Sequence, residues 1–383
     1  MSQHLQTTAL VRRSAFALVA GVALLAAGCG SSSSSSTSGG PRWTSETRNT
    51  FTASLDMDGF RELGFDLRWS GAAVMTRGAR VERADIFGDG IVVQESKHAV
   101  SMLRAETGEA VWSTVLGNTL TRFVGNARSG DRVYVASDVE LFVLSAQTGD
   151  LLDRHPLDIV VNTPPVVTNG AAFFGSPTGR VLAHDVRTGQ GRWQYQLTGT
   201  ITTAPVLAGD HVGVASEGGD VIVLDPLTGK ASGRGRAFDG PGGAIDATDS
   251  VVAVASRDQS VYGFSTTGGR LWRYRTESQL SGDVRIIDDV VYVSVPRAGM
   301  VGLDAYSGEV VWTAGGVSGA ALGFVDGNVL VRSGDELMAI DDRGETIASV
   351  RVPGLHTAQM SDPLDGDLYL VTDRGAVSRF NRR

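Results

Sequence analysis

Cysteine is almost absent from this 383-residue chain, in which Cys29 stands alone. A disulfide within the chain, a Cys-x-x-Cys redox pair and a cysteine-rich zinc site are therefore excluded. Proline is also scarce, with 11 residues, and the 49 glycines follow no Gly-x-y period, so a collagen-like fold is excluded as well. In a chain that is 42% hydrophobic, this excess of glycine indicates many tight turns around a sizeable core, as in all-β repeat proteins.

The chain also has few positive charges and lacks common catalytic motifs. The 34 Lys and Arg residues are outnumbered by 42 Asp and Glu, and the net charge of −8 makes nucleic acid or an anionic membrane surface a poor partner. The sequence has no HExxH, GxSxG or GxGxxG, and its six histidines are scattered, which favours strand or surface positions over ligand positions. We therefore expect no enzyme, no cofactor and no metal site.

One acidic segment resembles the start of a calcium-binding loop. Residues Asp56-Met57-Asp58-Gly59 have the right spacing, but Leu67 stands at the twelfth position, where such a loop needs a glutamate. We interpret the segment as a local turn and expect no calcium there.

The only long apolar run, Ser14–Ala27, lies near the amino terminus behind Arg12 and Arg13. As a helix it would reach roughly 21 Å, short of the hydrocarbon core of a membrane, so it predicts a cleaved signal peptide over residues 1–28. The segment LLAAGC, which ends at Cys29, is similar to a bacterial lipoprotein signal, although that signal prefers Leu where Ala26 stands. This resemblance implies that Cys29 is the first mature residue and carries the lipid. Residues 29–63 then form a linker rich in Ser and Gly and a lead-in segment.

The rest of the chain, residues 64–383, repeats one pattern eight times. Each repeat has a run of β-forming residues that ends at a small residue, and these end points lie 38 to 41 residues apart: Ser96, Ser137, Ser176, Ser216, Ser256, Val295, Ser333 and Thr372. A period of about 40 residues with four short strands per unit is typical of a β-propeller. We therefore predict an all-β fold, an eight-bladed β-propeller of four-stranded antiparallel blades.

Seven of the eight repeats also have a hairpin turn in which a glycine suits a positive φ. These turn glycines are Gly108, Gly149, Gly189, Gly229, Gly268, Gly308 and Gly344. Tryptophans follow in a fixed register four residues later, and with Trp69 they form a set that we expect to pack between blades: Trp69, Trp112, Trp193, Trp272 and Trp312. Trp69 has no turn upstream, and the last repeat lacks a final strand. We therefore expect the strand Phe65–Ser70 to complete the last blade and close the ring.

These repeats resemble the family named after pyrroloquinoline-quinone enzymes, in segments such as Asp185–Trp193 and Asp304–Trp312. With the lipoprotein start and the count of eight blades, the chain resembles the BamB family of lipoproteins, subunits of the outer-membrane β-barrel assembly machine. The resemblance implies a lipid-anchored scaffold without catalysis on the periplasmic face of the outer membrane, with a protein partner and contact to the membrane through the lipid only.

The BamB resemblance also implies partner-binding loops at Gln194–Ala204 and Arg234–Ala244, with Arg234, Arg236 and Asp239 as the candidate contact residues. The segment Gly233–Arg236 stands where an outer strand belongs, and its composition favours a frayed, exposed strand. A general envelope propeller with another protein or a glycan as partner stays open, anchored at the cytoplasmic membrane if the source has no outer membrane. A quinone-dependent dehydrogenase is disfavoured, because its cofactor site needs a pair of adjacent cysteines.

Overall fold

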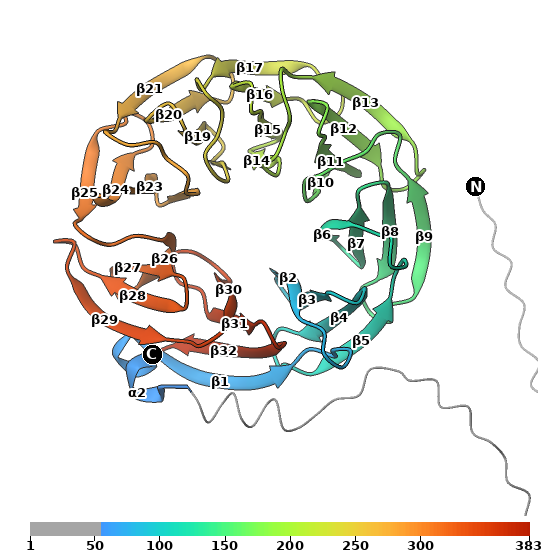
Figure 1. Ribbon diagram of the computed structural model, residues 1–383, viewed down its shortest axis with the longest axis horizontal. Helices are drawn as coiled ribbons and strands as arrows, with labels where there is room; N and C mark the ends of the chain where they lie inside the picture. Colours follow the sequence, from blue (N-terminus) through green and yellow to red (C-terminus); the bar gives the residue numbers. More distant parts are fainter. Residues whose placement is uncertain (1–54) are drawn as a thin grey trace, which may run out of the picture. The chain divides into compact units, whose positions relative to one another are not determined.

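Residues 55–383 are described by a computed structural model, and the prediction of an eight-bladed β-propeller is confirmed. Figure 1 shows eight four-stranded antiparallel sheets arranged in a ring, with the chain running once around it. The predicted signal peptide, Cys29 and the serine-rich linker lie outside the described residues. Within the described part, no helix is long and apolar enough to cross a membrane.

We number the blades in chain order, from the innermost to the outermost strand. Blades 1 to 4 contain β2 (Val81–Phe87), β3 (Gly90–Glu95), β4 (Ala99–Arg104) and β5 (Ala110–Val115); β6 (Phe123–Ser129), β7 (Arg132–Ser137), β8 (Glu140–Ser145) and β9 (Leu151–Pro156); β10 (Val166–Thr168), β11 (Ala171–Gly175), β12 (Arg180–Asp185) and β13 (Gly191–Gln196); β14 (Val206–Ala208), β15 (His211–Ala215), β16 (Asp220–Leu224) and β17 (Ala231–Arg236).

Blades 5 to 8 follow the same plan, except that the last blade takes its outermost strand from the start of the domain. They contain β18 (Asp246–Ala247), β19 (Val251–Ser256), β20 (Ser260–Ser265) and β21 (Arg270–Arg275); β22 (Val284–Ile287), β23 (Val290–Val295), β24 (Gly299–Asp304) and β25 (Val310–Ala314); β26 (Ala320–Val325), β27 (Asn328–Ser333), β28 (Glu336–Ile340) and β29 (Thr346–Arg351); β30 (Leu355–Met360), β31 (Leu368–Thr372), β32 (Ala376–Arg382) and β1 (Phe65–Ala72).

The ring closes by the predicted pairing of the first strand with the last. β1 pairs antiparallel with β32 from Phe65 opposite Arg382 to Ala72 opposite Ala376. In Figure 1 the blue strand β1 lies along the outer side of the red strand β32. Without β1, the strand β32 would be an exposed edge, so this pairing completes the last blade.

A short helix, α2 (Met57–Glu62), precedes β1 and packs at the closing blade. The other blades have a turn between their third and outermost strands, whereas in this blade the third strand β32 and the outermost strand β1 come from opposite ends of the domain. Phe60 of α2 is buried together with Leu63, which lies between α2 and β1, and Phe380 of β32. The lead-in segment therefore contributes to the core from residue 55 onward. Asp56 caps the helix by accepting a hydrogen bond from the Gly59 amide at 2.9 Å, which is a local structural role.

Five of the eight interfaces between neighbouring blades, which we call seams, contain one of the predicted tryptophans. Each indole Nε1 donates a hydrogen bond to a backbone carbonyl of the next blade, at 2.7 to 3.2 Å: Trp69 to Ala105, Trp112 to Ala146, Trp193 to Pro226, Trp272 to Ala305 and Trp312 to Asp341. At Gly108 an added Cβ would lie 2.3 Å from the Trp69 ring, so the turn glycine also lets the indole approach closely. Gly268 is the exception among the seven turn glycines, because its φ is not positive.

Three seams have no tryptophan, and each is filled in a different way. Between blades 2 and 3, Asp153 takes the tryptophan register, and His155 lies against Gly189 instead. Between blades 4 and 5 the position is Gly233, and the neighbouring amide of Arg234 donates to the Gly268 carbonyl at 3.2 Å. Between blades 7 and 8 the position is Ala348, which shares a core cluster with α2.

Candidate functional site

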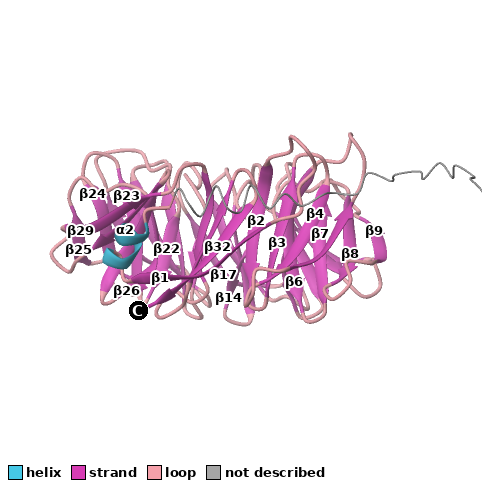
Figure 2. Cartoon of the chain, turned by 90° about the horizontal axis from the view of Figure 1, so that it is seen from below, coloured by secondary structure: helices cyan, strands magenta, loops and turns pink. Residues whose placement is uncertain are grey.

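The ring has two ends that differ in the connections they display. One end, which we call the loop mouth, contains the loops that join successive blades and the turns between the second and third strands of each blade. The other end contains the turns between first and second strands and the glycine turns. Figure 2 shows the strands running between these two ends. Both predicted partner-binding loops, Gln194–Ala204 and Arg234–Ala244, reach the loop mouth, since they join β13 to β14 and β17 to β18.

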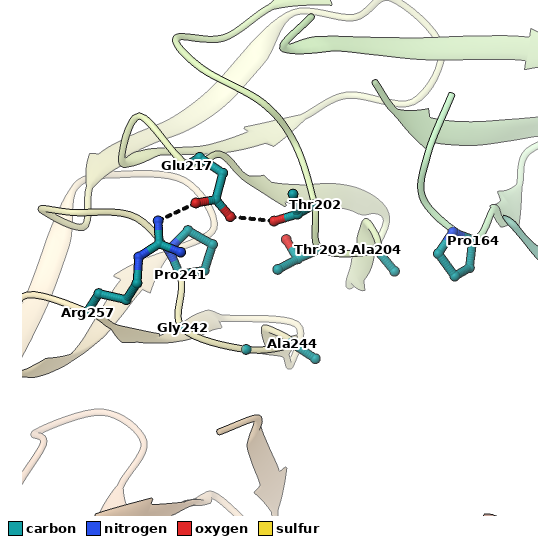
Figure 3. A pocket seen from close by; sticks show the side chains of 10 residues that line it. Pro164, Thr202, Thr203, Ala204, Glu217, Pro241, Gly242, Ala244 and Arg257 are labelled. Atoms are coloured by element: carbon teal, nitrogen blue, oxygen red, sulfur yellow. Dashed lines mark hydrogen bonds and ion pairs between the residues drawn. The ribbon is translucent and has the colours of Figure 1, made fainter. Parts of the chain in front are cut away.

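A cleft of about 310 Å³ lies where these two loops meet. Thr202, Thr203 and Ala204 line it from the first loop, and residues 241–244 line it from the second. Its remaining walls are Pro164, Glu217 and Arg257 (Figure 3). The structure thus brings the two predicted loops together into one surface that spans blades 3 to 5.

An ion pair between neighbouring blades fixes the shape of the cleft. Arg257, in the turn after β19, donates from its guanidinium to the carboxylate of Glu217, in the turn after β15. The same carboxylate accepts a hydrogen bond from the Thr202 hydroxyl at 2.5 Å, and Arg257 Nε donates to the Asp239 carbonyl at 3.0 Å. Glu217 and Arg257 therefore hold both partner-binding loops (Figure 3).

The charge state of Glu217 follows from these contacts. Burial raises the pKa of its carboxyl, but the hydrogen bonds from Arg257 and Thr202 outweigh burial and hold the pKa below its usual value. The carboxylate is therefore ionised at neutral pH and matches the guanidinium. This pair was not predicted, although Glu217 and Arg257 each follow the serine that ends a repeat and lie one repeat apart.

The candidate contact residues lie beside the cleft rather than inside it. Arg234 and Arg236 extend from the outer strand β17, with their guanidinium carbons 5.8 Å from the centre of the Tyr195 ring and 5.9 Å from that of Phe238. Asp239 adopts a positive φ of 62° in the following loop. The three side chains are exposed, and Arg236 reaches the loop mouth, where its guanidinium donates to the Gly218 carbonyl at 3.3 Å.

The expectation of a frayed strand at Gly233–Arg236 is wrong. β17 is a strand that pairs with β16 from Ala231 to Arg236, with one register shift between Ala231 and Gly233. Its glycines are required by the seam, because an added Cβ at Gly235 would lie 2.2 Å from the Phe264 ring and one at Gly233 would lie 2.9 Å from the Ser265 carbonyl. Glycine here permits close approach of two blades and does not indicate a weak strand.

A patch of exposed apolar side chains also lies at the loop mouth, beside the cleft, and was missed from the sequence. Leu120, Val139 and Val160 are 90%, 45% and 52% exposed. Backbone hydrogen bonds connect the three segments that contain them, from Asp138 to Arg122 and from Val161 to Asp138. We call these three residues the apolar patch. Pro164 belongs to the same loop as Val160 and lines the cleft, so patch and cleft are adjacent.

Nothing in the described residues converges as a reactive set. Among residues 55–383 no group of three or more His, Cys, Asp or Glu side chains is placed to hold a metal ion. The cleft contains one carboxylate, which is paired with Arg257, and its remaining side chains are Thr, Pro and Ala. The arrangement is suited to contact with another macromolecule through shape and a few polar groups.

The family model and the curated relatives that match this chain have the same description. A family model described as outer membrane protein assembly factor BamB matches residues 96–236, 231–352 and 259–383. The curated BamB of Burkholderia pseudomallei (strain K96243) is 29% identical over 150 residues, which cover 37% of this chain and 39% of that protein. The BamB of Yersinia pestis is 23% identical over 248 residues, which cover 59% of this chain and 54% of that protein. The alignments thus span between about two fifths and just over half of these relatives.

Solved structures show the same fold. The crystal structure of BamB from Moraxella catarrhalis superimposes with a TM-score of 0.66 at 18% identity, covering 83% of this chain and 97% of that chain. The computationally designed Ika8 protein gives a TM-score of 0.65 at 14% identity, covering 79% of this chain and 96% of that one. At such identities the likeness concerns the fold alone.

Proposed function

Because the chain belongs to the family of the outer membrane protein assembly factor BamB, we propose that it is a scaffold that binds a protein partner of the cell envelope through its loop mouth. The partner we propose is a component of an outer-membrane β-barrel assembly complex. The scaffold binds without catalysis and without a cofactor.

The observation that carries this proposal is the convergence of both loops on one cleft, fixed by Glu217 and Arg257. Loops that are held by hydrogen bonds to a rigid ring lose little conformational entropy when a partner docks, so more of the contact energy is available for binding. The adjacent apolar patch supplies the hydrophobic area that protein interfaces use.

The proposed location follows from the amino terminus. We propose that Cys29 is lipidated and that residues 1–28 are removed, which anchors the scaffold at the periplasmic face of the outer membrane. Contact with the membrane is through the lipid, since a net charge of −8 gives no general attraction to anionic lipid or to nucleic acid.

Photo-crosslinking from the cleft tests the proposal directly. Amine-reactive reagents suit this chain poorly, because Lys97 and Lys230 are its only lysines. A photoreactive amino acid at Thr202, in cells of the native species, should capture a subunit of the assembly complex. The matched control is Leu227, which is 64% exposed in a turn at the opposite end of the ring and should capture none.

Two outcomes would change the proposal. Equal capture from Thr202 and Leu227 would show that the loop mouth is not the binding surface. Capture from Thr202 of an envelope protein outside the assembly complex would leave a scaffold with a different partner.

A further inference from the structure

The seam between blades 2 and 3 differs from the others in its chemistry. His155 of β9 takes the place of an indole, with its ring against the turn glycine Gly189. A second histidine, His184 of β12, lies behind it in blade 3. An indole stays neutral at every pH that the protein experiences, whereas an imidazole titrates near pH 6.5.

The two imidazoles are in direct contact and hidden from water. His184 Nε2 lies 3.4 Å from His155 Nδ1, and the ring centroids are 5.4 Å apart. The residues are 0% and 4% exposed. One hydrogen between the facing nitrogens satisfies a neutral pair, whereas protonation of both rings would place two positive charges against each other in a dry seam.

A positive charge on His184 finds little compensation among the neighbouring groups, whereas one on His155 would face Asp153. His184 Nδ1 and His155 Nε2 have no aligned hydrogen-bond partner, although Asp153 Oδ2 lies 3.0 Å from the latter. Asp158 and Asp185 also face His184, but Asp185 is paired with Arg192 at 2.8 Å. Burial first, and His155 second, lower the pKa of His184 to about 4 despite these carboxylates.

The seam is also connected to the proposed binding site. β9, which carries His155, runs directly into the loop that contains Pro164, and Pro164 lines the cleft. The same loop carries Val160 of the apolar patch. Thr163, next to Pro164, is hydrogen-bonded to Gly175 of blade 3, whereas Val161, next to Val160, donates to the Asp138 carbonyl of blade 2. A change in the spacing of blades 2 and 3 therefore moves the apolar patch relative to the cleft.

We propose that the His155–His184 pair makes the seam between blades 2 and 3 a pH-sensitive joint, which loosens on acidification and weakens partner binding at the adjacent cleft. The second half of this inference rests on the proposed function. The direction follows from linkage: a histidine whose pKa is lower in the closed seam than in the open one stabilises closure above pH 6.5, and that stabilisation is lost as pH falls toward 4.

Hydrogen–deuterium exchange of the intact ring measures the seam without any partner. After correction for intrinsic rates, peptides of β9 and β12 should exchange about tenfold faster at pH 5.5 than at pH 7. This factor is expected if opening of the seam is coupled to the uptake of one proton. Peptides of β21 and β24, at the Trp272 seam, are the internal control and should not change. Equal acceleration at both seams, or none at β9 and β12, overturns the proposal.

Variants and crosslinking separate the joint from the binding function. The variant His184→Gln should abolish the pH effect on exchange, and His211→Gln, in a partly exposed strand position, is the matched control that should keep it. If His184→Gln does not fold, the proposal is judged on the pH dependence of exchange in the unaltered protein at the two seams. Crosslinking from Thr202 is then compared at the two pH values. No capture at either pH refutes the proposed function alone, whereas equal capture with an opened seam refutes the regulation alone.

Discussion

The ring of Phe60 stacks on that of Phe380, with centroids 4.0 Å apart and planes 21° from parallel. Phe60 belongs to helix α2 ahead of the first strand, and Phe380 belongs to the last strand, so the contact joins the two ends of the domain. Phe60 therefore contributes to ring closure beside the β1–β32 pairing.

Replacing Phe60 with alanine should destabilise the protein by about 3–5 kcal/mol, the usual loss for a fully buried phenylalanine. Denaturant unfolding followed by tryptophan fluorescence measures the change. Phe238→Ala is the control, because Phe238 is 51% exposed and should cost far less. Similar losses for both variants would show that α2 is not part of the closing blade.

The seam tryptophans should differ in their contribution to stability. Trp272 is 7% exposed, and Trp272→Ala should cost about 3–5 kcal/mol. Trp193 is only partly buried, so Trp193→Ala should cost less, though still more than a surface change. The midpoint of urea unfolding gives the order, and an unchanged midpoint in both variants would contradict a packing role.

Replacing Arg234, Arg236 and Asp239 together with alanine should weaken partner capture and leave the fold intact. All three side chains are exposed, so the free energy of unfolding should change by no more than about 1 kcal/mol. Capture yield from the Thr202 crosslinker, read beside the thermal melting curve, gives both quantities. Full capture by a folded variant would show that the partner uses another part of the loop mouth.

The cleft ion pair should matter more for binding than for stability. Arg257→Gln removes a partly exposed ion pair, at a cost of about 1 kcal/mol or less. It also frees the second loop, which Arg257 holds through the Asp239 carbonyl. We expect a severalfold drop in capture. Arg297→Gln is the matched control: Arg297 occupies the equivalent turn of blade 6 and donates to Ser278 at 2.9 Å. Equal effects of the two variants would exclude a special role for Arg257.

The proposed anchor depends on a single residue. Cys29→Ser should release the protein into the soluble fraction or leave it as an unprocessed precursor, because no other thiol can accept the lipid. Fractionation with immunodetection separates these states. Cleaved protein that still sediments with membranes would place the anchor elsewhere.

The repeating parts of the fold were predictable, and so was ring closure by Phe65–Ser70, because the defects of the first and last repeats complement each other. The substitutions within single seams were not predictable. Trp112 and Gly149 each have a fixed place in a 40-residue pattern, so their neighbourhood follows from the period. His155 lies two residues beyond the tryptophan register, and its partner His184 belongs to another blade, so no local pattern connects them. Gly235 appeared to weaken a strand because its contact, the Phe264 ring, is distant in sequence.

The cleft was predictable in outline only. The positions of the two loops between blades follow from the strand order. Glu217 and Arg257 occupy equivalent places in successive repeats, and the repeat period could have shown that they meet. The orientation of Arg234 and Arg236 depends on the Tyr195 and Phe238 rings, which the period does not determine.

The pairing of β1 with β32 also sets the order in which the chain can fold. Strands within blades 1 to 7 meet neighbours that are close in sequence, so these hairpins can form early and locally. β1 must wait for a partner about 300 residues away, and the entropy of closing so large a loop is lost before β1 gains its pairing with β32. Until the final strand arrives, β1 and Trp69 remain uncovered, which makes the nearly complete ring the stage of folding most exposed to misassociation.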